Sequence, residues 1–248
     1  MIEIPVAIIT GASDGIGAEL AKIMAEGCND KLFLVLCGRS GKKLSQVGYA
    51  CQQLGAAVLE VSADLRQEAK CRELIGMCVQ RFGRIDTLVT CAGILQGAFV
   101  DLADFPLETF ERVIDVNVRG TFLSVKHVAP HIAKAGGGVV LCIASGAGVK
   151  GGSSSIAYGT SKAGVHGMVM VLESRLAPQN IRIHAICPGA IDTPLKRENV
   201  RDAATASGQD PDAALKAAHL ASPDGVARVL AFLASADADY VRGTIFTR

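Results

Sequence analysis

The sequence has no tryptophan, few other aromatic residues and almost no excess of either charge. Aromatic residues make up 4% of the 248 residues, and the formal net charge is +1. A protein that binds nucleic acid needs a basic surface for the phosphates, and for single strands it needs aromatic platforms for the bases. We therefore expect no nucleic-acid partner. No uncharged apolar run reaches the roughly 18 residues of a membrane span, so we expect no membrane insertion.

The N-terminus and the cysteines indicate where the protein resides. Residues 1–10 lack the basic start of a secretory signal, and Glu3 and Pro5 interrupt the apolar run. The eight cysteines form no C-x-x-C pair and no His/Cys cluster with zinc spacing, so no metal site is expected. Several lie inside strand-like apolar runs, which is typical of buried, reduced thiols. We expect a reducing compartment, the cytoplasm.

Short apolar runs alternate with longer helix-compatible segments along the whole sequence. The predicted strands are Val6–Thr10, Leu32–Cys37, Ala57–Val61, Thr87–Cys91, Val139–Ile143, Arg182–Cys187 and Thr244–Phe246. The predicted helices are Ile16–Glu26, Lys42–Leu54, Glu68–Arg81, Glu108–Ala133, Ile156–Leu176 and Pro223–Ala234. Continuous apolar runs are typical of parallel strands that are buried on both faces. The pattern predicts a doubly wound, Rossmann-type α/β fold with about seven parallel strands and helices on both faces, in a single domain spanning residues 1–248.

One segment interrupts this alternation. Leu195 to Leu220 is polar, charged and rich in alanine, and it has no strand pattern. Long insertions between sheet elements are often lids or binding loops. We expect residues 194–220 to be a substrate-binding lid, and the alternative is a pair of solvated helices without a role.

A glycine-rich turn follows the first predicted strand. In Thr10–Gly17, Gly11, Gly15 and Gly17 form a G-x-x-x-G-x-G pattern at the start of a predicted helix. Glycines allow the backbone to approach a pyrophosphate, and the helix N-terminus presents free N–H groups to it. The turn predicts a dinucleotide site, and the alternative is a tight turn without a ligand.

Three residues form a candidate proton-transfer group. Tyr158 and Lys162 are four residues apart, so they share one face of the predicted helix, and Ser145 follows a predicted buried strand. An ammonium about 4 Å from a phenol can lower the phenol pKa by up to ~3 units. A tyrosine and a lysine at this spacing are otherwise an ordinary solvated helix face. Ser145 and the upstream glycine turn favour the catalytic interpretation.

These motifs, in this order, resemble those of the short-chain dehydrogenase/reductase family. The resemblance covers almost the whole chain. It rests on Thr10–Gly17, Asp64, Ala92-Gly93, Asn117, Ser145, Tyr158, Lys162, Pro188-Gly189 and Thr193. It implies an enzyme that transfers hydride between a nicotinamide cofactor and a small-molecule carbonyl/alcohol pair.

The resemblance also implies roles for the catalytic residues. Tyr158 matches the general acid/base of the family, and Ser145 matches the hydroxyl that holds the substrate oxygen. Lys162 matches the residue that lowers the tyrosine pKa and binds the nicotinamide ribose. Asn117 matches a helical position whose main chain holds a proton-relay water, although it also suits an ordinary helical asparagine.

Further residues match cofactor contacts of the family. Asp64 matches a contact to the adenine amino group, but it also fits an N-cap of the next helix. Thr193 matches a contact to the nicotinamide amide, but Thr193-Pro194 is also a good N-cap and first-turn pair. The expected cofactor-binding residues are Gly11, Ser13, Asp14, Gly15, Ile16, Gly17, Arg39, Ser40, Asp64, Leu65, Ala92, Gly93, Tyr158, Lys162, Pro188, Gly189, Ile191 and Thr193.

The sequence departs from the family pattern in two places near the expected cofactor. Thr90-Cys91 stands where the family usually has Asn-Asn, so hydrogen bonds that stiffen the pocket are missing or remade. Asp14 occupies a position that is often basic in relatives that prefer NADP.

The end of the second strand bears on the choice of cofactor. A fold selective for NAD has a carboxylate there to bind the ribose 2′-hydroxyl, whereas this sequence has Arg39 and Ser40. Arginine offers a planar fork of donors that suits a phosphate. We expect a preference for NADP(H), with Asp14 as the argument against it and NAD(H) as the alternative.

Several alternatives stay open at the level of sequence. The fold also suits a dinucleotide-binding sensor without catalysis, and the same site suits an epimerase or dehydratase. The substrate is not identified: Lys196, Arg197 and Arg201 either attract an anion or form a solvated helix face. We expect a homotetramer or homodimer that pairs through Glu108–Ala133 and Ile156–Leu176. The apolar residues that suggest pairing are Val165, Met168, Val169, Val171 and Leu172.

Overall fold

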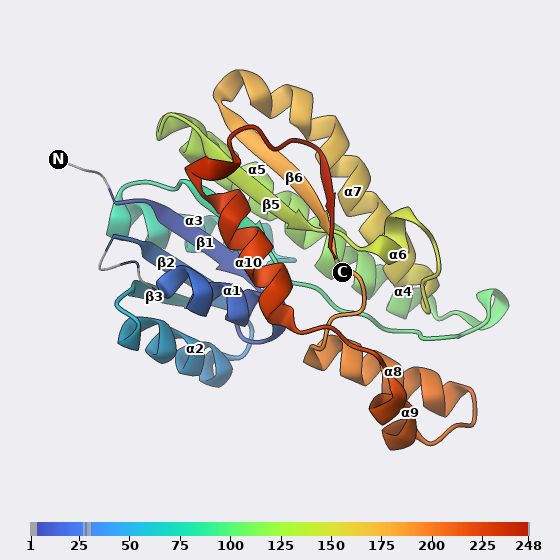
Figure 1. Ribbon diagram of the computed structural model, residues 1–248. Coiled ribbons are helices and arrows are strands. Elements are labelled where there is room, and N and C mark those ends of the chain that lie inside the picture. Colours follow the sequence, from blue (N-terminus) through green and yellow to red (C-terminus); the bar gives the residue numbers. More distant parts are fainter. Residues whose placement is uncertain (1–3, 27, 29–30, 248) are drawn as a thin grey trace.

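The centre of the molecule is one parallel sheet. The structure is a computed structural model that describes residues 4–26, 28 and 31–247, so Met1 and Arg248, the ends of the predicted domain, lie outside the described residues. Within these residues the sheet has seven strands in the order β3-β2-β1-β4-β5-β6-β7, all parallel (Figure 1). The strands are β1 Val6–Thr10, β2 Phe33–Gly38, β3 Ala57–Ser62, β4 Thr87–Thr90, β5 Gly138–Ile143, β6 Ile181–Cys187 and β7 Thr244–Phe246. The predicted Rossmann-type fold is confirmed.

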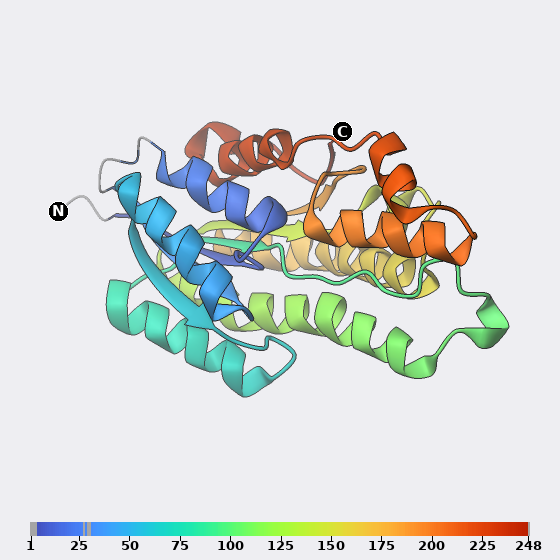
Figure 2. The same cartoon turned by 90° about the horizontal axis from the view of Figure 1, so that it is seen from below.

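Helices cover both faces of this sheet, which makes three layers (Figure 2). One face carries α1 Gly15–Ala25, α2 Gly41–Gln53 and α10 Pro223–Ala234. The other face carries α3 Glu68–Phe82, α5 Gly120–Lys134 and α7 Ile156–Leu176. Shorter helical elements are Leu102–Asp104, α4 Leu107–Ile114, α6 Gly146–Val149, Ala177–Gln179, α8 Pro194–Ala206, α9 Pro211–Ala217 and Ala236–Ala238.

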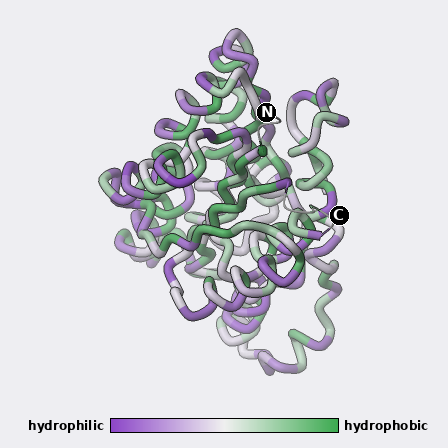
Figure 3. Tube along the Cα trace, turned by 90° about the vertical axis from the view of Figure 1, so that its left-hand side faces the viewer, coloured by the Kyte–Doolittle hydropathy of each residue, from purple (hydrophilic) through white to green (hydrophobic). Residues whose placement is uncertain are grey.

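The two helix layers require strands that are apolar on both sides. Ile8 packs in the core cluster under α3, α5 and α7, whereas its neighbour Ile9 packs in the cluster under α1, α2 and α10. Both side chains are 0% exposed, and burying each stabilises the fold by about 1.5–3 kcal/mol. Figure 3 shows the same arrangement, with hydrophobic strands inside and hydrophilic turns outside. The continuous apolar runs in the sequence therefore reflect burial on both faces.

The strand order creates a crevice at the carboxyl ends of the central strands. The chain passes from β1 to β2 and β3 on one side and returns to β4 on the other, so β1 and β4 are neighbours that lead to opposite halves. Ligands of open α/β sheets bind at this switch point, beyond the carboxyl ends of the strands. The glycine turn after β1 and the Thr90–Gly93 segment after β4 meet at this crevice.

One helix that was predicted as continuous is interrupted in the structure. The segment predicted as Glu108–Ala133 consists of α4, a π-helical turn over Asp115–Arg119, and α5. Asn117 lies in the π turn and is 0% exposed. A π turn inserts an extra residue into the helix and often marks a functional position. The amphipathic pattern continues through such a turn, so it did not reveal the interruption.

The segment predicted as a lid forms two helices, α8 and α9, that pack against each other beyond the carboxyl end of the sheet (Figure 1). The Thr193 side chain accepts a hydrogen bond from the Lys196 N–H and so starts α8. The Asp210 side chain starts α9 in the same way. Along the described ranges, no helix has the length and apolar character needed to cross a membrane.

Candidate active site

The glycine turn after β1 is built for close backbone contact. Gly11 has φ +67°, and a Cβ on it would lie 2.5 Å from the main-chain nitrogen of Ala92. A Cβ on Gly17 would lie 2.5 Å from the carbonyl oxygen of Gly11. Only glycine fits either position. Asp14 precedes α1 without capping it through its side chain, so the first N–H groups of α1 remain available to an anion.

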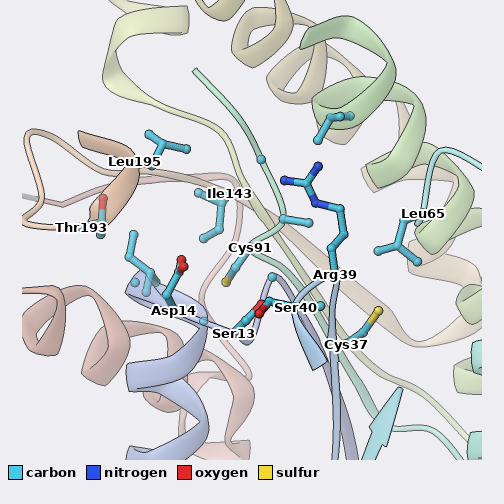
Figure 4. Close-up of a pocket in the computed structure, with 18 of the residues that line it drawn as sticks. Ser13, Asp14, Cys37, Arg39, Ser40, Leu65, Cys91, Ile143, Thr193 and Leu195 are labelled. Carbon is cyan, nitrogen blue, oxygen red and sulfur yellow. The ribbon is translucent and has the colours of Figure 1, made fainter. Parts of the chain in front are cut away.

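A pocket of about 350 Å³ starts at this turn and crosses the crevice. Fifteen of the predicted cofactor-binding residues line it: Gly11, Ser13, Asp14, Gly15, Ile16, Gly17, Arg39, Ser40, Asp64, Leu65, Ala92, Gly93, Tyr158, Lys162 and Thr193. Figure 4 shows Arg39 extending from the end of β2 into this space, with Thr193 and Leu195 on the opposite side. The sequence interpretation missed nine further residues that line the pocket, namely Cys37, Gly38, Lys43, Ala63, Arg66, Cys91, Val116, Ile143 and Leu195.

Charged side chains gather at the β2 end of the pocket. The Lys43 ammonium lies 3.0 Å from the Asp14 carboxylate, and both side chains are about half exposed. The Ser40 side chain accepts a hydrogen bond from the Lys43 N–H and caps α2. Arg39 makes no ion pair with any residue that the structure describes. The Asp14 charge is therefore compensated by a lysine outside the predicted site, while the Arg39 guanidinium stays open to a ligand.

Asp64 binds its neighbour Arg66 and does not cap the next helix. Its carboxylate accepts hydrogen bonds from the Arg66 main-chain N–H at 3.1 Å and from the Arg66 guanidinium at 2.6–3.0 Å. These bonds hold the Asp64 pKa below its usual value. Gln67, not Asp64, occupies the N-cap of α3. The alternative interpretation of Asp64 as an N-cap is wrong.

The candidate catalytic side chains meet at the carboxyl end of β5. Ser145 is 8% exposed and caps the short helix α6 by accepting from the Ala147 N–H. Its hydroxyl lies near the Tyr158 phenol, whose pKa it lowers, and both residues line the same cavity. Ser155 caps α7 at the Tyr158 N–H, which places Tyr158 in the first turn and Lys162 one turn later. The i, i+4 spacing thus brings both side chains to the pocket, as predicted.

The pKa values of this pair differ from expectation. The Lys162 ammonium lies 5.7 Å from the centre of the Tyr158 ring and donates to the Ile143 carbonyl at 2.7 Å. Burial lowers the pKa of Lys162 to about 8. Burial also raises the pKa of Tyr158, against a smaller lowering by the Ser145 hydrogen bond. Without a bound cofactor, the structure shows no lowering of the tyrosine pKa by Lys162, because the desolvation of the phenol outweighs the other influences.

Asn117 connects three parts of the site. Its side-chain oxygen accepts from the Ile94 N–H at 2.8 Å, and its amide donates to the Ile94 carbonyl and to the Ser161 hydroxyl, both at 2.9 Å. The Thr121 hydroxyl donates to the Asn117 carbonyl at 2.7 Å. The side chain thus ties the segment after β4 to α7 beside Lys162. The family resemblance implied a role only for the main chain of this residue.

Backbone hydrogen bonds partly replace those that the usual Asn-Asn pair would make at Thr90-Cys91. The Cys91 N–H donates to the Thr10 carbonyl at 3.1 Å, and the Ala92 N–H reaches the Thr10 hydroxyl at 3.4 Å. The Thr90 hydroxyl is buried, and its contact is to the Cys142 thiol, a weak partner. Burial raises the pKa of Cys91 and of Cys142 to about 12. Both are protonated thiols beside Lys162.

A second, larger cavity of about 950 Å³ adjoins the catalytic residues. Ser145, Tyr158 and Thr193 line it, together with Pro188, Gly189 and Ile191, which the first pocket does not include. The 194–220 segment supplies the rest of one wall, namely Leu195, Lys196, Asn199, Val200, Ala203, Ala204, Ser207, Gln209 and Ala214. Two cavities therefore meet at Tyr158: one begins at the glycine turn, and the other lies under α8 and α9.

Comparison with known proteins agrees with this arrangement. The model of the short chain dehydrogenase family matches residues 5–204. The chain belongs to this family. An uncharacterized oxidoreductase of Staphylococcus saprophyticus is 37% identical over 77% of this chain and 80% of its own. Cis-4-hydroxycyclohexanecarboxylate dehydrogenase of Sinomonas cyclohexanicum is 33% identical over 97% of this chain and 93% of its own.

Solved structures of short-chain dehydrogenases share the fold over nearly the whole chain. Levodione reductase has a TM-score of 0.89 at 29% identity and covers 99% of this chain and 96% of its own. An actinorhodin polyketide ketoreductase with NADPH has a TM-score of 0.89 at 26% identity, covering 98% and 95%. NAD⁺-bound xylitol dehydrogenase has a TM-score of 0.88 at 27% identity, covering 98% and 96%. This short-chain dehydrogenase is thus an oxidoreductase. Of these three similar structures, one holds NADPH and one holds NAD⁺.

Proposed function

We propose that the protein is a dehydrogenase/reductase that uses Tyr158 as general acid/base on a carbonyl/alcohol substrate and prefers NADP(H). The observation that carries the proposal is the continuity of the first pocket, which begins at the glycine turn and ends on Tyr158 and Lys162. Two features of this pocket suit a dinucleotide. Gly11 and Gly17 let the turn pack directly against the backbone of Ala92 and of the turn itself, and the N-terminus of α1 presents free N–H groups to an anion.

The chain's own residues account for the proton transfer. A bound nicotinamide supplies or accepts the hydride. In carbonyl reduction, Ser145 and Tyr158 hold the substrate oxygen, and the phenol O–H bond breaks as the new alcohol O–H bond forms. In alcohol oxidation the deprotonated Tyr158 oxygen takes the alcohol proton as the alcohol O–H bond breaks, so this direction requires that Tyr158 has first given up its own proton. The raised pKa of Tyr158 keeps the phenol protonated through neutral pH, so the proton that reduction requires is present on Tyr158.

Lys162 and Asn117 would support Tyr158. Lys162 is 4% exposed and its ammonium lies one helical turn below the phenol, in reach of the cofactor pocket that it lines. With a pKa lowered to about 8, Lys162 can exchange a proton near neutral pH and restore the proton of Tyr158. Asn117 holds the segment after β4 and α7 together. We assign it this positioning role along with the proton-relay role that the resemblance implies.

The preference for NADP(H) rests on the charges at the end of β2. Arg39 extends into the pocket (Figure 4), and its planar donor fork suits a 2′-phosphate. Lys43 pairs with Asp14 at 3.0 Å and also lines the pocket, so the carboxylate that argued against a phosphate carries its own counter-charge. Ser40 adds a hydroxyl at the same place. No carboxylate follows β2 directly to select the 2′-hydroxyl of NAD(H).

A panel of ketones and alcohols, each tested with NADPH or NADP⁺ and with NADH or NAD⁺, tests the proposal through the absorbance of the reduced nicotinamide. The panel includes cis-4-hydroxycyclohexanecarboxylate, from which the Sinomonas relative takes its name. We expect turnover of at least one pair, with a higher kcat/KM for NADP(H). Cofactor binding without any turnover would favour the sensor, and a higher kcat/KM with NAD(H) would contradict the preference.

We further propose that residues 194–220 act as a lid over the substrate and that the protein acts as a homodimer or homotetramer. Support for the lid comes from the residues of α8 and α9 that line the cavity beside Tyr158. Support for an oligomer is weaker than the sequence suggested. Val165 and Val169 are 0% and 3% exposed and belong to the core, whereas Val171 is 57% exposed.

A further inference from the structure

The charged side chains that line the cavity beside Ser145 and Tyr158 are all positive. Of the side chains that line it, only Lys150 and Lys196 carry a charge, and none is acidic. Much of the remaining wall is apolar, including Phe99, Leu195 and Val200. A cavity with this lining favours a ligand that has an apolar body and a negatively charged group.

The three cations at the start of α8 differ in their surroundings. Arg197 forms a two-pronged ion pair with Asp192 at 2.5 and 2.7 Å, and Arg201 lies 3.3 Å from Asp212. Both arginines are exposed. Lys196 is half-buried and lines the cavity, and it forms no ion pair with any described residue. The solvated-face interpretation thus holds for the two arginines and fails for Lys196.

A polar relay fixes the Lys196 ammonium at the cavity wall. The ammonium donates to the Asn199 side-chain oxygen at 3.1 Å, and the Asn199 amide donates to the Ser154 hydroxyl at 2.9 Å. Asn199 is 2% exposed, so its orientation is set by these two bonds. An ammonium has three donors, and the described contacts use one. Two N–H groups of Lys196 remain for a ligand.

Desolvation adds to the case for an anion. Burial lowers the pKa of Lys196, which means that the charged form has lost part of its hydration without gaining a counter-ion from the protein. A ligand anion would offset that loss. Lys150 differs, because it is exposed and its ammonium lies 4.1 Å from the centre of the Phe246 ring. An aromatic face already stabilises that cation.

We propose that the substrate is a hydroxy or keto carboxylic acid whose carboxylate binds Lys196 while its alcohol or carbonyl group meets Ser145 and Tyr158. The proposal rests on the function proposed above and specifies its substrate class. A single ammonium with two free donors matches the single charge of a carboxylate. A phosphate ester carries a charge of about −1.5 to −2 near pH 7, which a single ammonium does not balance.

Kinetics with matched substrates test this assignment. The probes are methyl-keto carboxylic acids of increasing chain length and their primary amides, which have the same shape without the charge. We expect kcat/KM to favour the acid by at least about tenfold at the best chain length, as for a charge-assisted hydrogen bond. Lys196→Met should abolish this preference with little change for the amide, and Lys196→Arg should retain most of it.

Two control variants separate Lys196 from a general charge effect. Arg197→Gln removes the adjacent, exposed and ion-paired cation, and the acid-to-amide ratio should stay unchanged. Lys150→Met removes the other cavity cation, and the ratio should again persist. An equal use of acids and amides by the wild type would overturn the proposal. So would a preference that survives in Lys196→Met or is lost in Lys150→Met.

A binding measurement distinguishes failure of this proposal from failure of the proposed function. Calorimetric titration with cyclohexanecarboxylate and cyclohexanecarboxamide needs no turnover. We expect the carboxylate to bind the wild type at least about tenfold more tightly and the two to bind Lys196→Met equally. If no substrate is turned over but this difference appears, the anion site stands and the catalytic assignment fails. If the affinities are equal in the wild type, the anion site is wrong even where catalysis is found.

Discussion

The two cavities that meet at Tyr158 are built in different ways. The first begins at a backbone turn, at Gly11, Gly17 and the N-terminus of α1, and its two acids, Asp14 and Asp64, are each paired with a cation. The second has one wall of side chains from the 194–220 segment, and its half-buried cation, Lys196, has no acidic partner among the described residues. In the proposed function, the first cavity would hold the cofactor and the second would hold the substrate.

The difference explains what the sequence could predict. A backbone cradle requires glycines at fixed places in a strand–turn–helix unit, so Thr10–Gly17 is recognisable from the order of its residues alone. A side-chain cavity requires only that suitable residues converge, and Lys196, Asn199 and Ser154 converge from α8 and from the loop before α7. Helical spacing places Lys196 and Asn199 side by side, but nothing in the sequence places Ser154 beside them.

The largest expected effect lies where the cavities meet. Tyr158→Phe removes the proton donor and should lower kcat by about 10²–10⁴-fold, as for other general acids. The affinity for the cofactor should change little, because the hydroxyl is needed only for the chemistry. Fluorescence titration with NADPH and steady-state rates measure the two quantities. A variant that retains more than about a hundredth of the wild-type rate would remove Tyr158 from its role.

Lys162→Met should separate activity from stability. Loss of the ribose contact and of proton exchange should lower both kcat and cofactor affinity. The variant should nevertheless unfold at a higher denaturant concentration at pH 7, because burial lowers the lysine pKa from 10.5 to about 8. A shift of that size corresponds to a penalty of about 3 kcal/mol on the charged form, reduced by about 1 kcal/mol for the lost bond to Ile143.

The sign of the pH dependence follows from the same shift. Between pH 8 and 10.5 the unfolded lysine holds a proton that the folded lysine has lost, so the stability of the wild type rises with pH in that window. The advantage of Lys162→Met should therefore shrink as pH increases from 8 toward 10.5. Denaturant unfolding at several pH values measures it. A variant that is less stable at pH 7 would contradict the burial argument.

Variants at the β2 end of the first cavity compare the use of NADPH with the use of NADH. Arg39→Ala should lower kcat/KM for NADPH by about tenfold or more and leave NADH nearly unchanged. Lys43→Ala should also act against NADPH, because it removes a cation and exposes the Asp14 charge. Asp14→Asn is the matched control and should not weaken NADPH. Unchanged use of NADPH by Arg39→Ala would refute the assignment.

The smallest effect on catalysis is expected at the proposed subunit contact. Met170 and Val171 are 61% and 57% exposed on α7, and Phe122 is 48% exposed on α5. We expect light scattering to give the mass of a dimer or tetramer at micromolar concentration, and Val171→Asp to shift it toward the monomer. Rates per subunit should change little. A wild-type monomer at that concentration would exclude the proposed oligomer.

Particular residues show how far the sequence prediction reached. The seven strands follow from the apolar runs and are confirmed. Helical spacing predicts that Tyr158 and Lys162 share one face, and both line the first pocket, while Ser145 and Tyr158 line the second. The Asp64–Arg66 bond and the π turn at Asn117 were not predicted. Sequence patterns report which face of an element is buried. They do not report which of several possible partners a polar side chain takes.

The central claim is that one site joins a nicotinamide cofactor to a carbonyl/alcohol substrate through Tyr158. The most direct test mixes the purified protein with NADPH and a ketone from the panel, and measures both the reduced nicotinamide consumed and the alcohol formed. The account predicts one alcohol for each NADPH oxidised, and loss of both in Tyr158→Phe. A rearranged or dehydrated product with no net change in NADPH would contradict it and assign the site to an epimerase or dehydratase.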